Sequence, residues 1–290
     1  MDPFELIDVS LTSSRAKRFV ANIGPRFEGE LVPGKSLSIT ELLGGWTYKI
    51  TSDESKDGEV EHIFLNGDQC FKYSSDPIEG WKQWYKYWRE VLRCEFYTVK
   101  FDLSCPGFRD LVDWLKGQQE DFDIMTIQSS EECDDDLKYV LRAFPNVPKL
   151  EISVSRYKKD FKIEFAEKMS QLLIGNAKFI DIEQFLRLKA QKIVFGEHCL
   201  TNEDINRFVR GWMSMETHVG LRTLMLRMEN RDRFNGMLTG IPFEQITDVE
   251  ILKACEHRLP GDDMFRITRC DGKRCLVYVL AGSYLCMDVC

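Results

Sequence analysis

The chain has 290 residues and a formal net charge of −8, with 43% hydrophobic and 30% charged residues. This balance is typical of globular proteins with buried cores and excludes an intrinsically disordered chain. The negative charge argues against a general nucleic-acid-binding protein, which needs a basic surface to neutralise phosphates, so we expect no nucleic-acid partner.

The sequence predicts neither a signal peptide nor a membrane span. Its amino terminus is acidic and lacks an apolar core. The longest apolar run, Cys275 to Met287, is interrupted by Gly282 and Ser283 and is too short to cross a bilayer. Ten cysteines without a secretory signal are typical of reduced thiols. We therefore expect a cytoplasmic or nuclear protein with no membrane partner.

Residues 1–20 predict two short helices joined by a polar turn. Asp2 is suited to cap the first helix, and Pro3 is suited to be its first residue. Ser13 or Ser14 can cap the second helix. The apolar residues of the first helix recur on one face, and they are Phe4, Ile7 and Leu11. Helices this short bury little surface alone, so we expect them to pack on a partner surface.

The sequence of residues 1–18 resembles the second half of an F-box. It reads Met-Asp-Pro-Phe-Glu-Leu-Ile-Asp-Val-Ser-Leu-Thr-Ser-Ser-Arg-Ala-Lys-Arg. This is similar, almost letter for letter, to the nematode F-box family that carries an F-box-associated domain of type 2. That family's F-box begins upstream, so we expect residues 1–22 to form a partial F-box. The resemblance implies that five residues contact a Skp-type adaptor: Pro3, Phe4, Leu6, Ile7 and Leu11.

Residues 23–95 predict a linker and a small β-rich region. Two prolines and three glycines among residues 21–37 are typical of a linker. Strands are predicted at Trp46–Ile50 and Val60–Leu65, and Asn66-Gly67 indicates a hairpin turn. The sequence therefore predicts a small antiparallel sheet.

A tryptophan stripe follows this region. Trp81, Trp84, Tyr85 and Trp88 recur at helical spacing, with basic residues between them. Such a stripe is typical of a core-facing helix. Basic and aromatic interleaving also marks partner-binding surfaces, so a contact patch formed by Trp81, Trp84 and Trp88 is the alternative.

Residues 96–290 predict short strands alternating with helices. Apolar segments recur about 25 to 28 residues apart in its first part, which is in the leucine-rich-repeat range. The predicted strands cover residues 97–103, 124–127 and 150–154, and a helix is predicted over 108–115. A capping box at Ser129–Glu132 predicts a helix that carries Leu137 and Phe144. A further helix is predicted to carry Phe165, Met169, Leu172 and Leu173. We interpret this as a degenerate leucine-rich-repeat-like domain, with a conventional α/β sheet as the alternative.

A helix after Thr201 is the clearest single element. Thr201 and Asp204 fit a cap, and the apolar positions Ile205, Phe208, Val209 and Trp212 share one face. The segment Leu200–Trp212 resembles the core motif of the type 2 F-box-associated domain. So do three later segments: Leu221–Leu226, Phe265–Lys273 and Met287–Val289. Within them, Asp271-Gly272 predicts a two-residue hairpin turn.

No catalytic or metal-binding pattern stands out. Phosphate-binding loops, nucleophile elbows and zinc-binding helices do not occur. His198 and Cys199 are adjacent, which in a strand places them on opposite faces. The acidic run Glu131–Asp136 fits a helix start better than a calcium loop. Four cysteines have a loose zinc-like spacing, but core thiols explain them better: Cys270, Cys275, Cys286 and Cys290. We expect no metal and no cofactor.

The sequence thus predicts an α+β or α/β protein with a partial F-box at residues 1–22, a linker and small β-rich region at 23–95, and an F-box-associated, leucine-rich-repeat-like domain at 96–290 that ends in a β-hairpin. The resemblance implies a non-enzymatic substrate-recognition subunit of an SCF-type ubiquitin ligase. Its partners would be a Skp-type adaptor, a cullin and an unknown protein substrate. The alternative is a ligase-independent protein-binding module that has lost adaptor binding.

Overall fold

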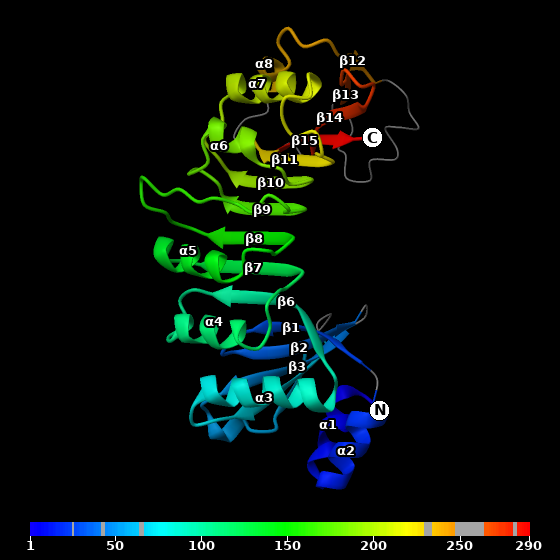
Figure 1. Cartoon of the computed structure of the whole chain (residues 1–290), viewed down its shortest axis with the longest axis vertical. Helices are drawn as coiled ribbons and strands as arrows, with labels where there is room; N and C mark the ends of the chain where they lie inside the picture. Colours follow the sequence, from blue (N-terminus) through cyan, green and yellow to red (C-terminus); the bar gives the residue numbers. More distant parts are fainter. Residues whose placement is uncertain (25, 42–43, 64–66, 229–233, 247–263, 281–282) are drawn as a thin grey trace. The chain divides into compact units, whose positions relative to one another are not determined.

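The computed structural model describes residues 1–24, 26–41, 44–63, 67–228, 234–246, 264–280 and 283–290 (Figure 1). The chain forms two compact units. Unit 1 comprises residues 1–129 and 135–145, and unit 2 comprises residues 130–134 and 146–290. The boundary that we predicted between residues 95 and 96 lies inside unit 1. Among the described residues, no helix is both long enough and apolar enough to span a membrane.

Unit 1 contains a mixed sheet with helices packed on it (Figure 1). Its strands are β1 (Glu28–Val32), β2 (Ser36–Glu41), β3 (Gly44–Thr51), β4 (Val60–Ile63), β5 (Gly67–Tyr73), β6 (Glu95–Asp102) and β7 (Ile124–Ser129). Its helices are α1 (Pro3–Leu11), α2 (Ser14–Ile23), the 3-10 turn η1 (Glu54–Lys56), α3 (Pro77–Val91), α4 (Phe108–Lys116) and α5 (Asp134–Ala143), the first residue of which groups with unit 2.

The sheet of unit 1 corrects the prediction of a small antiparallel sheet. The strand order is β7-β6-β1-β2-β3-β5-β4, and β3·β5, β1·β6 and β6·β7 are parallel pairs. The strands of residues 23–95 are therefore part of a larger mixed sheet. Alternation of apolar residues identifies a strand but not its neighbour, so it did not show that β6 returns beside β1. Asn66 of the predicted hairpin lies outside the described residues.

Helix α3 covers one face of this sheet with its aromatic stripe. Asp76 caps the helix by accepting from the amides of Ile78 and Glu79, and Pro77 begins it. Trp81 and Trp88 are fully buried, and Trp81 Nε1 donates to Ser36 O at 3.0 Å. The stripe at helical spacing is thus a core face, as the first of our two interpretations predicted.

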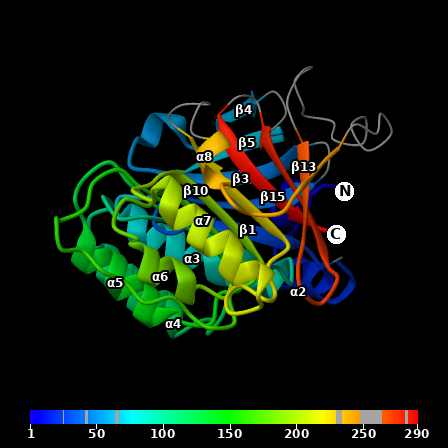
Figure 2. The ribbon, with the colours of Figure 1, turned by 90° about the horizontal axis from the view of Figure 1, so that it is seen from above.

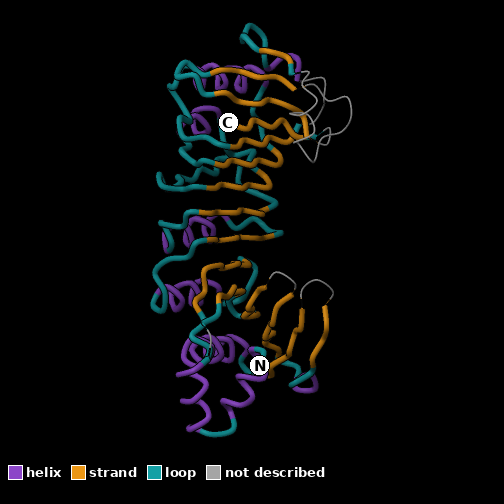
Figure 3. The backbone as a smooth tube through the Cα atoms, turned by 90° about the vertical axis from the view of Figure 1, so that its right-hand side faces the viewer, coloured by secondary structure: helices purple, strands orange, loops and turns teal. Residues whose placement is uncertain are grey.

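Unit 2 also contains a mixed sheet (Figures 1 and 3). Its strand order is β12-β13-β14-β15-β11-β10-β9-β8. The strands are β8 (Lys149–Val154), β9 (Gln171–Asn176), β10 (Lys192–Glu197), β11 (Thr223–Arg227), β12 (Glu244–Gln245), β13 (Met264–Thr268), β14 (Arg274–Leu280) and β15 (Tyr284–Val289). The helices are α6 (Ile182–Arg187), α7 (Asn202–Met213) and α8 (Phe234–Met237). Strands β8 to β11 run parallel, which requires crossover connections between them.

Two predicted helical features of this region are wrong. The helix expected to carry Phe165 and Leu173 does not form, because Leu172 and Ile174 are the buried, alternating positions of β9. The apolar residues before β9 fill an irregular segment whose spacing imitates a helix. The capping box expected at Ser129–Glu132 is also misplaced, since Ser129 ends β7 and α5 begins at Asp134.

The carboxyl-terminal strands form two antiparallel pairs, β13·β14 and β14·β15. Figure 2 labels the outer two of these strands, β13 and β15. The predicted hairpin is confirmed, but its turn is longer than two residues. Arg269 N donates to Lys273 O and Gly272 N donates to Arg269 O, with Gly272 at φ +86°. Within this turn, Asp271 accepts from both Arg269 and the Lys273 amide.

A candidate protein-binding groove along helix α7

Helix α7 has one apolar and one polar side because of its residue spacing. The Thr201 hydroxyl accepts from the Asp204 amide, and the Asp204 carboxylate accepts from the Thr201 amide, so a capping box begins the helix. The core-facing residues of the helix are buried, and they are Ile205, Phe208, Val209 and Trp212. The opposite side therefore presents polar residues, with Asn206 and Arg210 one turn apart.

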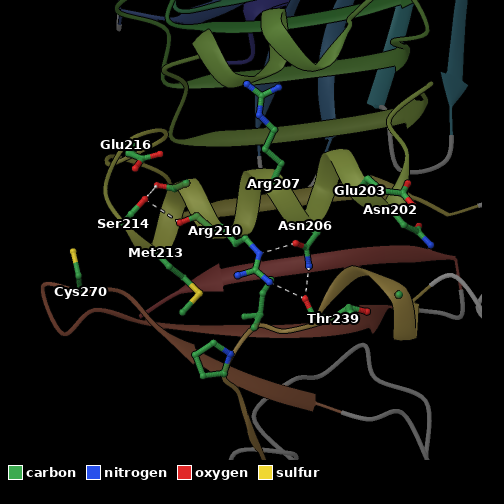
Figure 4. Close-up of a pocket in the computed structure, with 14 residues that line it drawn as sticks. Asn202, Glu203, Asn206, Arg207, Arg210, Met213, Ser214, Glu216, Thr239 and Cys270 are labelled. Atoms are coloured by element: carbon green, nitrogen blue, oxygen red, sulfur yellow. Dashed lines mark hydrogen bonds between the residues drawn. The ribbon is translucent and has the colours of Figure 1, made fainter.

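Asn206 and Arg210 bind the backbone of residues 237–240 (Figure 4). Asn206 Nδ2 donates to Met237 O at 2.7 Å and to Thr239 O at 3.0 Å. Arg210 Nη2 donates to Thr239 O at 3.0 Å and to Gly240 O at 2.9 Å, and its Nε donates to Asn206 Oδ1. Four hydrogen bonds to backbone carbonyls thus hold one segment at a fixed distance from the helix. Gly240 has φ +65°, a backbone conformation that favours glycine.

Between the helix and this segment lies an open groove of about 1030 Å³. We call it the α7 groove. Its lining residues are Asn202, Glu203, Asn206, Arg207, Arg210, Gly211, Met213, Ser214, Glu216, Gly236, Thr239, Ile241, Pro242 and Cys270. Acidic and basic side chains line the groove together with apolar side chains. Arg207 points away from Thr239 and pairs with Glu183 of α6 at 2.6 Å (Figure 4).

The far end of the groove is fixed by a buried arginine. Arg269 forms two hydrogen bonds with the Asp271 carboxylate, donates to Val219 O at 2.8 Å and lies over the Trp212 ring. The guanidinium lowers the pKa of Asp271 to about 2, so the pair stays charged at neutral pH. The next residue, Cys270, donates its amide to Met213 O, which places its exposed thiol at the end of α7.

His218 packs between Phe185 of α6 and Phe208 of α7. Thr217 Oγ1 donates to Leu186 O, so the proton it shares with His218 Nδ1 must come from the imidazole. The Nε2 atom is buried and has no hydrogen-bond partner. Desolvation lowers the pKa of His218 to about 4, so the ring is neutral at physiological pH.

The α7 groove combines a wall held by backbone hydrogen bonds with charged and apolar side chains, an arrangement that can bind a partner. Among the described residues, no group of three or more His, Cys, Asp or Glu side chains is arranged to hold a metal ion. The register also separates two of the four cysteines considered for zinc. Cys275 lies opposite Val289, and Cys286 lies opposite Tyr278, which places the two thiols on opposite faces of the sheet.

The segment that contains α7 can be compared with known protein families. Residues 159–226 match the family model described as F-box associated. The matched residues contain β9, β10, α6 and α7, and therefore most of the residues that line the α7 groove. No curated protein and no solved structure matches the chain.

The five residues that the resemblance assigned to adaptor contact lie on α1 in unit 1. Pro3, Leu6 and Ile7 are buried, and Ile7 has no exposed surface. Phe4 stacks on Tyr48 of β3 with ring centroids 5.0 Å apart. Leu11 is different, with 55% of its surface exposed. In the described structure, most of this set therefore packs within unit 1 and one member faces solvent.

The alternative tryptophan patch is divided in the same way. Trp81 and Trp88 are buried, whereas Trp84 is half-buried and contacts the rings of Tyr48 and Tyr87. Lys72 Nζ lies 5.6 Å from the Trp84 ring centroid. The three tryptophans therefore do not form one surface.

Sequence reasoning identified α7 but not the groove beside it. The polar spacing of Asn206 and Arg210 was visible, yet their acceptors are backbone carbonyls of residues 237–240, which have no sequence signature. The buried Arg269 was also missed, although Asp271 two residues later was a visible partner for it.

Proposed function

We propose that this protein is a substrate-recognition subunit of an F-box-type ubiquitin ligase and that the α7 groove binds its protein target. The match of residues 159–226 to the F-box-associated family carries this proposal. A ligase subunit of this kind contributes no nucleophile. It holds a target lysine at high effective concentration near the ubiquitin-conjugating enzyme.

The groove supports target binding through its preformed walls. The hydrogen bonds from Asn206 and Arg210 fix the facing segment before any partner arrives, which lowers the entropy cost of binding. Glu203 and Glu216 line the groove and are exposed. We therefore expect Glu203→Lys with Glu216→Lys to remove a set of proteins that co-purify with the chain. Glu164→Lys with Glu167→Lys, on exposed carboxylates outside the groove, is the matched control.

For the adaptor, we propose that Leu11 and Phe19 provide the contact, with Leu11 on α1 and Phe19 on α2. Their exposed fractions are 55% and 60%. Exposed apolar residues on adjacent helices are typical of interface anchors. The cullin would then bind through the adaptor.

Titration calorimetry of the full chain with a purified Skp-type adaptor tests this part. Leu11→Ala with Phe19→Ala should weaken binding on the order of a thousandfold, since two interface anchors contribute about 2 kcal/mol each. Val60→Ala, which shortens another exposed apolar residue of unit 1, should leave affinity unchanged. If the adaptor does not bind the unmodified chain, the ligase proposal fails.

Burial of Pro3, Leu6 and Ile7 favours a second candidate, a ligase-independent protein-binding module. Side chains packed inside unit 1 are not available to a partner. In that case the groove variants would still lose their co-purifying proteins, while the adaptor would bind neither the unmodified nor the altered chain.

A further inference from the structure

The sheet of unit 2 has a second face that the helices do not use. Phe195 of β10 contacts Phe185 of α6, and Phe185 contacts Phe208 of α7, so the helices lie on the side of Phe195. Alternate residues of each strand point to the other side. We call the surface formed by these alternate residues of β9, β10 and β11 the outer face.

Strand register orders the outer face into three rows, each running across the strands. The first row is Gln171, Lys192 and Thr223. The second row is Leu173, Val194 and Met225, all half-buried. The third row is Gly175, Gly196 and Arg227. An apolar row therefore lies between a row with a lysine and a row with an arginine.

The two glycines of the third row have no side chains, so only backbone is present at those two positions. A Cβ atom added to Gly196 would lie 2.2 Å from Gly175 O, so the strands approach too closely there for a side chain at residue 196. Beyond Met225, the apolar row meets a buried cluster of Ile246, Met264, Tyr278 and Cys286. The apolar row thus continues into this cluster at one end, and along one side it borders two positions without side chains, Gly175 and Gly196.

The charge of the outer face opposes that of the chain. Lys149 on β8 extends the first row, so three exposed basic residues surround the apolar row: Lys149, Lys192 and Arg227. Two carboxylates lie on the same face: Glu151 at the β8 end of the apolar row, and Asp288, opposite Thr223 at the β15 end of the first row. No described carboxylate forms an ion pair with Lys149, Lys192 or Arg227. The whole chain, by contrast, has a net charge of −8.

We propose that the outer face binds an extended protein segment whose residues on one side read acidic, apolar, acidic. Successive rows are about 6.6 Å apart, because residues i and i+2 of a strand are separated by twice the rise of about 3.3 Å. An extended partner segment lying along the strands has the same repeat. Its carboxylates would then meet Lys192 and Arg227 while an apolar side chain between them meets Val194 and Met225.

Short synthetic peptides test this proposal with the full chain. A peptide containing Glu-Thr-Leu-Thr-Glu should bind at least about tenfold more tightly than one containing Lys-Thr-Leu-Thr-Lys or Glu-Thr-Ser-Thr-Glu, as measured by fluorescence polarisation. Methyl NMR should show shifts at Leu173, Val194 and Met225. The absence of binding, or equal binding of the serine peptide, would overturn the proposal.

A charge-reversal pair locates the binding site. Lys192→Glu with Arg227→Glu should reverse the preference toward the lysine peptide. Arg187→Glu with Lys189→Glu changes the net charge equally, on exposed residues at the end of α6, and should leave the preference intact. Equal effects of the two pairs would show a long-range charge effect and reject the site. The adaptor takes no part in these measurements, so their outcome is independent of the ligase proposal.

Discussion

His218 is a buried imidazole with one unused nitrogen, and its burial makes stability depend on pH. Its pKa is about 4 in the folded chain, below its ordinary value of 6.5. The unfolded chain therefore binds the extra proton first as pH falls. The stabilisation is fully present above pH 6.5 and is lost progressively as pH falls from 6.5 through 4.

We expect this histidine to contribute about 3 kcal/mol of pH-dependent stability between those limits. Urea unfolding at a series of pH values measures it. In His218→Phe, which fills a similar space between Phe185 and Phe208 but does not titrate, the free energy of unfolding should fall less between pH 6.5 and 4. His62→Gln, on an exposed histidine, should follow the unmodified chain. Identical slopes for all three proteins would contradict the expectation.

Arg269 is a second buried residue, and it shows why a buried charge was not recognised from sequence. Arginine is ordinarily exposed, and nothing in the local pattern marked this one as interior. Its four contacts come from Asp271, Val219 and Trp212, and two of these residues are far away in sequence. A tertiary pocket that satisfies a guanidinium is built from residues with no fixed spacing, so sequence alone does not identify it.

At the level of elements, β9 and β10 provide a matched pair of glycines. A Cβ atom at Gly196 would lie 2.2 Å from Gly175 O, whereas a Cβ atom at Gly175 has its nearest neighbour at 3.7 Å. We expect Gly196→Ala to lower the free energy of unfolding by about 1–3 kcal/mol because the strands must separate. Gly175→Ala should have a much smaller effect. Thermal and urea unfolding of both variants checks this, and similar losses would refute the steric explanation.

The helices and strands also show which parts of the fold sequence patterns can predict. Helical spacing located α3 and α7, because burial of one face imposes that period directly, and the Asp271-Gly272 pair located the hairpin of β13 and β14. The same reasoning failed at residues 165–173, where apolar residues of an irregular segment and of β9 combined into a false helical period. The order in which the strands pair could not be predicted either, because it depends on crossover connections that leave no local sequence pattern.

At the scale of the whole molecule, the amino-terminal helices are a part of unit 1. Phe4 stacks on Tyr48, Tyr87 OH donates to Ser10 Oγ, and Lys17 pairs with Glu90 of α3. The resemblance to an F-box predicted residues that face a partner. Packing instead buries Pro3, Leu6 and Ile7 within unit 1 and stacks Phe4 on Tyr48 of β3, a neighbour that the sequence did not identify.

Ile7 and Leu11 distinguish packing within unit 1 from exposure to a partner. Ile7 is fully buried, so we expect Ile7→Ala to cost about 2–5 kcal/mol of stability. Leu11→Ala removes a side chain that is 55% exposed and should change stability little. Calorimetric unfolding of the full chain distinguishes them. A large loss for Leu11→Ala would mean that α1 buries this residue in solution.

The division of the chain has a consequence for genes and fragments. Residues 130–134 group with unit 2, while the residues on both sides of them group with unit 1, so the polypeptide changes unit three times. A fragment starting at residue 146 lacks Asp134, whose carboxylate accepts from the Lys158 amide. Cutting the coding sequence at any one point in this region therefore separates residues that fold together. An exchange of either unit between related genes would need two or more junctions, so we expect the two units to be inherited together.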